Sequence, residues 1–294
     1  MSPITQLERS RQVVGAASSL PTAVARTRRA RASALVVAPE DTLVGELILV
    51  DSHHPVSEAA RRVRLATPFE TQPDVLLAKP ATAALRQAVC ELGLERRVGA
   101  ISGFRSRETQ QGLWDHLSTS GDAKTPSVAK PGASEHEAGL AVDLCRLWPL
   151  TGRLRPGFPC TGVCQRLREA LPRFGFVERY PEGREDVTGI AAEPWHFRYV
   201  GVPHALAMTR LGLTLEEWHK LLAREAPLAR PLAISNEGEV TPCPRHAAPA
   251  GSTLVAHAPV EGAYAVSLPH ARGAAFAHVS GTNAGGVIVT WPAA

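Results

Sequence analysis

One aspartate lies inside an otherwise aliphatic strand pattern, and it constrains the fold more than any other residue. The segment Leu140-Ala-Val-Asp-Leu144 predicts a compact buried strand. Burying a charged carboxylate among aliphatic neighbours is costly unless a cation or strong hydrogen-bond donors compensate it. A metal ion would supply that compensation, so we expect Asp143 to lie at a cation site on this strand.

Three places in the chain concentrate polar residues: Ser102-Gly-Phe-Arg-Ser106, Ser134-Glu-His-Glu-Ala-Gly-Leu-Ala-Val-Asp143, and Glu193-Pro-Trp-His196. Taken singly, each is ambiguous, because a lone histidine or aspartate near a strand is often a hydrogen-bonded structural residue. Together they supply two imidazoles and a buried carboxylate. Zinc with three such ligands keeps a fourth position open and lowers the pKa of a bound water to about 7. The combination predicts a catalytic zinc site at His136, Asp143 and His196.

Two local features of the chain would let these side chains converge. Gly139 allows a bend between His136 in a loop and Asp143 in a strand. Pro194 interrupts the strand pattern before His196, and a turn or bulge there could bring Glu193 beside the metal without making it a ligand. Glu193 is then the candidate general base, and an exposed loop acid is the alternative.

Other polar and aromatic residues near these motifs have less specific patterns. Arg105, between a predicted strand and a predicted helix, could offer paired donors to a terminal carboxylate or a developing oxyanion. Ser134 could add a hydroxyl donor to the same anion. A surface salt bridge and a loop cap are the respective alternatives. Trp195, Phe197 and Tyr199 alternate along one strand, which is typical of core packing.

The order of helix and strand patterns predicts an α+β domain followed by strands alone. In the first part we expect strands at 43–50, 98–102, 140–144, 175–180 and 196–200, and helices at 79–93, 106–117, 163–174 and from 214 onward. After residue 226, short strand patterns at 253–257, 264–267 and 286–290 predict a small all-β module.

Charge and composition exclude several classes of protein. The chain has a net charge of +4. Residues 1–39, a Ser/Ala/Arg-rich leader with six arginines and Glu8, carry +5, so the rest of the chain carries −1. Because the basic excess is not on the folded part, we exclude nucleic acid as a partner. No stretch of 18 apolar residues predicts a transmembrane segment. The five cysteines do not form the pattern of a disulfide scaffold.

At the motif residues the chain resembles the zinc D-alanyl-D-alanine carboxypeptidases of the VanY type. The family pattern Ser-x-His-x-x-Gly-x-Ala-x-Asp matches residues 134–143, and Glu-x-x-His matches residues 193–196. The wider group includes VanX-like dipeptidases, murein endopeptidases and the hedgehog signalling domain. The resemblance implies a small antiparallel sheet flanked by helices, Zn²⁺ on the three ligands, and Glu193 as catalytic acid/base. It also implies that Arg105 stabilises the substrate carboxylate or the tetrahedral intermediate, and that Ser134 and Gln110 line the pocket for the C-terminal D-Ala.

The chain therefore divides into a disordered basic leader at 1–42, a zinc peptidase domain at 43–225 and a β module of unassigned role at 226–294. The expected reaction removes the terminal D-Ala from peptidoglycan stem peptides or their precursors. Cleavage of the D-Ala-D-Ala dipeptide or another cell-wall bond is an alternative, as is a non-catalytic zinc fold that binds peptide. A wall substrate favours the cell envelope, whereas a soluble precursor permits the cytoplasm; the leader has no clear signal peptide.

Overall fold

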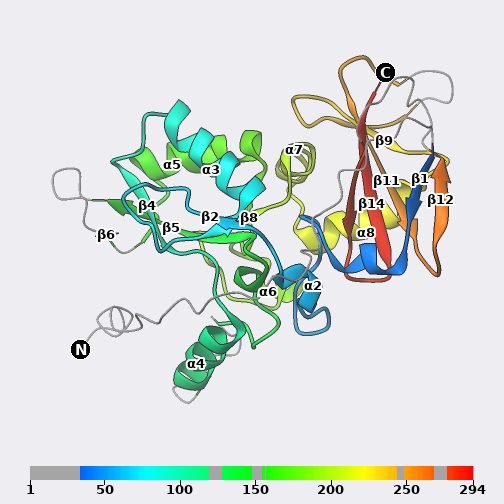
Figure 1. Ribbon diagram of the computed structural model, residues 1–294. Coiled ribbons are helices and arrows are strands. Elements are labelled where there is room, and N and C mark those ends of the chain that lie inside the picture. Colours follow the sequence, from blue (N-terminus) through cyan, green and yellow to red (C-terminus); the bar gives the residue numbers. More distant parts are fainter. Residues whose placement is uncertain are drawn as a thin grey trace.

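A computed structural model gives the fold, and it describes residues 34–118, 128–147, 154–155, 157–243, 248–267 and 277–293. Residues 1–33, most of the expected leader, lie outside that range. Figure 1 shows two β-rich regions side by side, the first carrying helices above its sheet and the second formed largely by the C-terminal strands. The expected α+β class is confirmed.

The first sheet is antiparallel throughout and brings together strands that are distant in sequence. Its order is β4-β5-β8-β7, and β6 also pairs with β5. The strands are β4 (Val98–Ser102), β5 (Ala141–Leu147), β6 (Leu154–Arg155), β7 (Phe176–Glu178) and β8 (His196–Tyr199). The two central strands, β5 and β8, are the ones that carry the expected ligands Asp143 and His196.

One face of this sheet packs against two amphipathic helices, α3 (Lys79–Glu91) and α5 (Gly162–Ala170). Val142 and Leu144 of β5 and Phe197 of β8 belong to that core. Because side chains alternate along a strand, Asp143 and His196 point to the opposite face. The sheet thus has one apolar face and one face on which charged groups gather.

Short elements and turns connect these parts. They are η1 (Pro39–Leu43), α2 (Glu58–Arg61), β2 (Leu65–Ala66), β3 (Leu77–Ala78), α4 (Arg107–Ser118), η2 (Glu135–Ala138), η3 (Leu171–Phe174) and α6 (Glu185–Thr188). Strands β2 and β3 pair with each other. Helix α4 projects from the side of the sheet opposite α3 and α5 (Figure 1).

The C-terminal part forms a second antiparallel sheet of order β10-β9-β11-β14-β13, and a separate pair joins β1 to β12. Its strands are β9 (Leu232–Ile234), β10 (Val240–Pro242), β11 (Thr253–Pro259), β12 (Tyr264–Ser267), β13 (His278–Gly281) and β14 (Gly286–Pro292). β1 spans Ala34–Val37. The expected β module is therefore present, and an N-terminal strand completes it.

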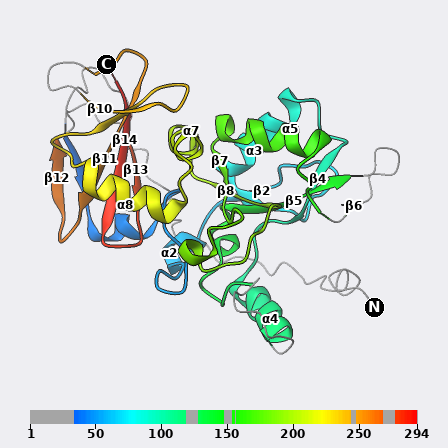
Figure 2. The ribbon, with the colours of Figure 1, turned by 180° about the vertical axis from the view of Figure 1, so that it is seen from behind.

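Two helices join the sheets through a common core. These are α7 (Val202–Leu211) and α8 (Leu215–Glu225), and Thr214 caps α8 as the capping-box sequence predicts. Both views show α7 between the sheets and α8 against the C-terminal one (Figures 1 and 2). One cluster contains Leu47, Trp218 of α8 and Ile288 of β14. Residues before and after position 225 therefore share buried apolar surface.

The N-terminal end of the fold differs from the sequence expectation in two respects. The segment 43–50, expected as a strand, forms none, although residues 47–50 are buried. Its backbone makes only scattered hydrogen bonds to the chain around β13, from the Gly281 amide to the Val44 carbonyl and from the Leu49 amide to the Thr282 carbonyl. Side chains supply others: the Arg198 guanidinium donates to the carbonyl oxygens of Glu46 and Ile48. Regular structure also begins earlier than expected, since β1 and η1 fall within the residues assigned to the leader. Within the described residues, no helix is long and apolar enough to cross a membrane.

Candidate active site

The pairing of β5 with β8 places two of the expected ligands next to each other. Asp143 and His196 are direct partners in the antiparallel register. The Nδ1 atom of His196 lies 2.9 Å from Oδ1 of Asp143. Two residues 53 positions apart in sequence thus meet on neighbouring strands.

The third expected ligand reaches the same place from a short turn. His136 lies in η2, which ends at Gly139 with a φ of 67°. That left-handed conformation favours glycine, and a Cβ there would come within 3.0 Å of the Ala78 backbone nitrogen. The bend directs His136 toward β5, and its Nε2 lies 3.3 Å from Oδ2 of Asp143. The expected role of Gly139 agrees with this geometry.

These three side chains fit a zinc ion. One ligand atom from each of His136, Asp143 and His196 can be chosen so that all lie within 4.8 Å of one another. Bonds of about 2.0 Å to a tetrahedral ion would place ligand atoms about 3.3 Å apart. The Nε2 atom of His136 is buried and has no hydrogen-bond partner, as an atom held ready for a metal would be.

The second nitrogen of each ring also faces an acceptor. Nδ1 of His136 lies 2.6 Å from the carbonyl oxygen of Gly103. Nε2 of His196 lies 3.6 Å from Oε2 of Glu135. Metal-binding histidines usually donate their other ring N–H to such acceptors, which fixes the tautomer. The arrangement leaves Nε2 of His136 and Nδ1 of His196 as the ring atoms that can face a metal ion.

Glu193 lies beside the three ligands. The amide of His196 donates to the carbonyl of Glu193 at 3.0 Å, which closes the expected turn around Pro194. One oxygen of Glu193 lies 3.6 Å from Nδ1 of His196. Burial raises the pKa of Glu193 to about 7, against the opposing effect of His196. A carboxyl group with such a pKa can accept and return a proton near neutral pH.

The charges of the ligands are coupled. Burial would raise the pKa of Asp143, but His136 and His196 outweigh it and hold that pKa well below its ordinary value. Burial, with the nearby Arg105, lowers the pKa of His136 to about 4. An ionised aspartate and a neutral imidazole are the states in which Asp143 and His136 would bind metal. Burial would lower the pKa of His196, but the carboxylates of Asp143 and Glu135 outweigh it and raise that pKa to about 9, so a metal would displace a proton from the ring.

A cavity of about 490 Å³ opens onto the ligands and collects the remaining expected residues. Arg105 lines it, with one guanidinium nitrogen 3.7 Å from Oδ2 of Asp143. Ser134 and Gln110 line it as well, and both are buried. The side-chain amide of Gln110 donates to the carbonyl of Ala129, while its Oε1 is buried without a hydrogen-bond partner. The structure therefore brings all seven expected site residues together.

Sequence reasoning missed part of the cavity wall. Trp195 was expected in the core with Phe197, but it is 36% exposed and lines the cavity. It precedes β8, so strand alternation does not govern its direction, whereas Phe197 is buried in the core as expected. Ile101 is also exposed at the cavity, and the Tyr180 ring lies 4.9 Å from that of His196.

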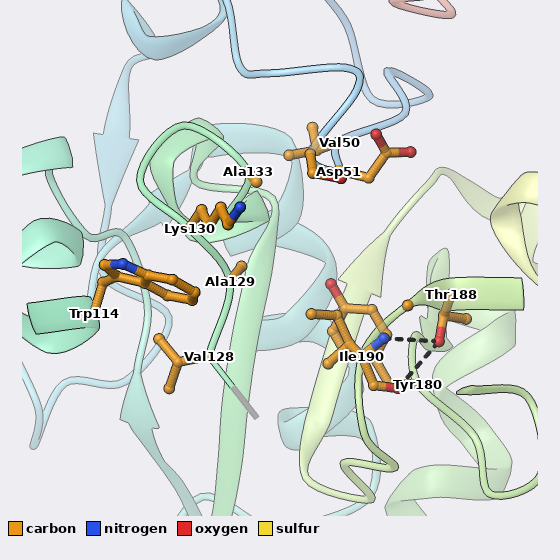
Figure 3. A pocket seen from close by; sticks show the side chains of 12 residues that line it. Val50, Asp51, Trp114, Val128, Ala129, Lys130, Ala133, Tyr180, Thr188 and Ile190 are labelled. Carbon is orange, nitrogen blue, oxygen red and sulfur yellow. Dashed lines mark hydrogen bonds between the residues drawn. The ribbon is translucent and has the colours of Figure 1, made fainter. Parts of the chain in front are cut away.

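A second cavity of about 180 Å³ adjoins the first. The two share four lining residues: Val128, Ala129, Tyr180 and Ile190. Figure 3 shows Trp114 and Lys130 on one side and Thr188 on the other, with Asp51 at a third edge. The site is thus one end of a longer depression in the surface.

Comparison with known proteins identifies the family of this chain. The family model described as VanY, D-alanyl-D-alanine carboxypeptidase, matches residues 77–202. A bifunctional D-Ala-D-Ala dipeptidase and carboxypeptidase, VanXYC of Enterococcus gallinarum, is 34% identical over 181 residues, which cover 60% of this chain and 95% of that protein. The chain belongs to the VanY family. The resemblance inferred from the motifs is confirmed.

Two further proteins are similar to this chain over different lengths. A D-alanyl-D-alanine carboxypeptidase of Enterococcus faecalis is 40% identical over 130 residues, covering 40% of this chain and 45% of that protein. The crystal structure of the vancomycin-resistance D,D-dipeptidase VanXYg, with a D-Ala-D-Ala phosphinate analogue, matches with a TM-score of 0.74 and 27% identity. It covers 88% of this chain and 98% of that one, so the likeness extends beyond the region that carries the motifs.

Proposed function

We propose that this VanY-family peptidase is a zinc-dependent D-alanyl-D-alanine carboxypeptidase that removes the terminal D-Ala from peptidoglycan stem peptides. The observation that carries the proposal is the meeting of His136, Asp143 and His196 beside Glu193 at the cavity. Zinc suits this set because two imidazole nitrogens and one carboxylate oxygen are typical of catalytic zinc sites. We also propose residues 43–225 as the peptidase domain.

Glu193 moves the proton in this proposal. Its carboxylate takes a proton from the attacking water while the water oxygen bonds to the last peptide carbonyl carbon. The carbon–nitrogen bond then breaks, and Glu193 delivers that proton to the leaving amine of D-Ala. A bound zinc ion supplies Lewis-acid chemistry, which polarises the carbonyl and makes water more acidic.

Three other residues orient the substrate. The Arg105 guanidinium presents donors to the peptide's terminal carboxylate or to the developing oxyanion, and its Nε is buried without a hydrogen-bond partner. Ser134 and Gln110 line the same cavity and bind the C-terminal D-Ala. Hydrogen bonds that only one orientation satisfies would place the scissile carbonyl next to Glu193.

The direct test measures D-Ala release from a stem pentapeptide, with and without a zinc chelator. We expect release that the chelator abolishes and that added zinc restores. A rate insensitive to the chelator would contradict the proposal. Parallel assays with D-Ala-D-Ala dipeptide, an L,D-linked tetrapeptide and a cross-linked peptide identify the preferred bond. They are needed because the similar proteins VanXYC and VanXYg are both named as dipeptidases.

A non-catalytic peptide-binding protein is the rival class. Glu193 argues against it, since a purely structural zinc site has no need of a base with a raised pKa. If the protein binds zinc and pentapeptide but cleaves none of the four substrates, the binding role replaces the enzymatic one.

A further inference from the structure

Two buried polar atoms face each other behind the metal-binding face of His196. They are Oε2 of Glu135 and Nε2 of His196, which lie 3.6 Å apart. Neither has a hydrogen-bond partner, and both residues are buried. A buried donor or acceptor left unpaired is costly. Each atom is therefore the natural partner of the other.

The opposite oxygen of Glu135 is already occupied. Nε of Arg179 donates to Oε1 at 2.8 Å, and Nη1 of Arg198 lies 2.6 Å from the same atom. All three side chains are almost fully buried. The carboxylate is thus fixed by two guanidinium groups on one side, which leaves Oε2 directed at the histidine.

Both arginines are held in turn by parts of the chain far from the site. Arg179 donates to both carboxylate oxygens of Glu216 in α8, at 3.1 and 2.5 Å. Arg198 donates to the backbone carbonyls of Glu46 and Ile48. The amide of the residue between these two, Leu47, bonds to the Ser280 hydroxyl of β13 at 2.7 Å. A continuous series of contacts runs from the C-terminal strands and α8 to His196.

We propose that Glu135 is a positioning residue, which accepts the Nε2–H of His196 and so presents Nδ1 to the metal in the correct tautomer and orientation. Helix α8 and the C-terminal sheet act through it by holding Arg179 and Arg198. This inference rests on the proposed zinc site, because it assigns a support to one of its ligands. It also gives the β module a structural part in the peptidase.

The experiment compares zinc affinity, measured by competition with a chromophoric chelator, in wild type and Glu135→Gln. Loss of a hydrogen-bond partner of a metal ligand typically weakens metal binding 10- to 100-fold, and we expect about that loss. Cobalt substitution adds a second readout, because the visible spectrum of bound Co²⁺ responds to the position of its ligands. We expect that spectrum to change in Glu135→Gln.

Glu137→Gln is the matched control. Glu137 is an equally buried acid in the same turn, but it bonds to the Gly132 amide and to Nε of Arg107 rather than to a ligand. We expect its zinc affinity to stay within about twofold of wild type, which corresponds to about 0.4 kcal/mol. An equal loss in both variants would show a general effect of buried acids and overturn the proposal.

Glu216→Gln tests whether α8 contributes to zinc affinity, because it removes the charge that holds Arg179 and leaves Glu135 unchanged. We expect a folded protein whose zinc affinity falls by a smaller factor than in Glu135→Gln. If Glu135→Gln fails to fold, this variant carries the test, and unchanged affinity with an unchanged cobalt spectrum would contradict the proposal. A wild-type protein that binds no zinc would instead refute the proposed function.

Discussion

Two groups of buried charged side chains lie next to each other in this protein, and they differ in how their charges are balanced. The first, the metal group, is His136, Asp143, His196 and Glu193, and it lines a cavity. The second, the arginine group, is Glu135, Arg179, Arg198 and Glu216; all four side chains are buried, and Glu135 also lines the cavity. Two arginines and two glutamates in the arginine group balance in charge.

This difference shows that burial of charge alone does not identify a reactive site. The arginine group pairs its charges within itself, as buried ions generally must. The metal group holds two carboxylates and two imidazoles, and Nε2 of His136 is left without a hydrogen-bond partner beside a cavity. An added cation would balance the carboxylates of the metal group, whereas the charges of the arginine group already balance. Four substitutions or conditions distinguish the two.

The largest effect is expected from Asp143→Asn. An amide removes the negative charge that a cation requires between the imidazoles, so we expect both zinc binding and D-Ala release to fall below detection. Zinc content after purification, with pentapeptide turnover measured in parallel, tests this. A variant that keeps stoichiometric zinc would show that Asp143 is not a ligand.

Glu193→Gln should separate chemistry from metal binding. Loss of a general base typically costs about 10²- to 10⁴-fold in rate, and we expect kcat to fall within that range. Zinc affinity should stay close to wild type, since Glu193 is not one of the three ligands. Undiminished kcat in this variant would mean that another group moves the proton.

In the arginine group, Arg179→Met should act on stability. Removing one partner from a buried ion pair typically destabilises a protein by about 3–5 kcal/mol, because the remaining charges are left uncompensated. Urea unfolding of the zinc-free protein measures this change. The control is Arg62→Met, which breaks an exposed pair with Glu58 and should cost less than about 1 kcal/mol. Similar losses in the two variants would contradict the view that Arg179 is part of a buried, charge-paired group.

The smallest effect is expected from acid. Burial alone would raise the pKa of Glu135, but Arg198 and Arg179 lower it far below the ordinary 4.5. A lowered pKa in the folded state adds stability above about pH 4.5 that is lost as the pH falls further. Wild type should therefore lose more stability than Glu135→Gln between pH 5 and pH 3. Parallel losses in zinc-free urea titrations would show that Glu135 is not held ionised.

The metal group could be predicted from sequence because its signals are local. Asp143 interrupts an aliphatic strand, and His136 precedes a glycine that turns the chain toward it. Each of these patterns spans only a few residues, so each expected ligand can be assigned to a strand or a turn without knowledge of the fold. The antiparallel register of β5 and β8 then completes the site. The assigned roles of the seven residues stay predictions until the variants are measured.

The arginine group could not be predicted in the same way. Glu135 and Arg179 are 44 residues apart, and Arg179 and Glu216 are 37 apart, so their pairing depends on how the strands and α8 pack. The only hint in the sequence was Glu135 itself, a charged residue between Ser134 and His136, and it does not say which residues pair with it. The same dependence explains the wrong strand at 43–50, whose backbone bonds to the side chains of Arg198 and Ser280 as well as to the backbone of Gly281 and Thr282.

The measurement that tests the central claim most directly is anomalous X-ray diffraction at the zinc edge on crystals of the zinc-loaded protein. We predict one strong peak within bonding distance of Nε2 of His136, a carboxylate oxygen of Asp143 and Nδ1 of His196, with its remaining position open to the cavity. A peak elsewhere, or a fourth protein ligand closing that position, would contradict the account.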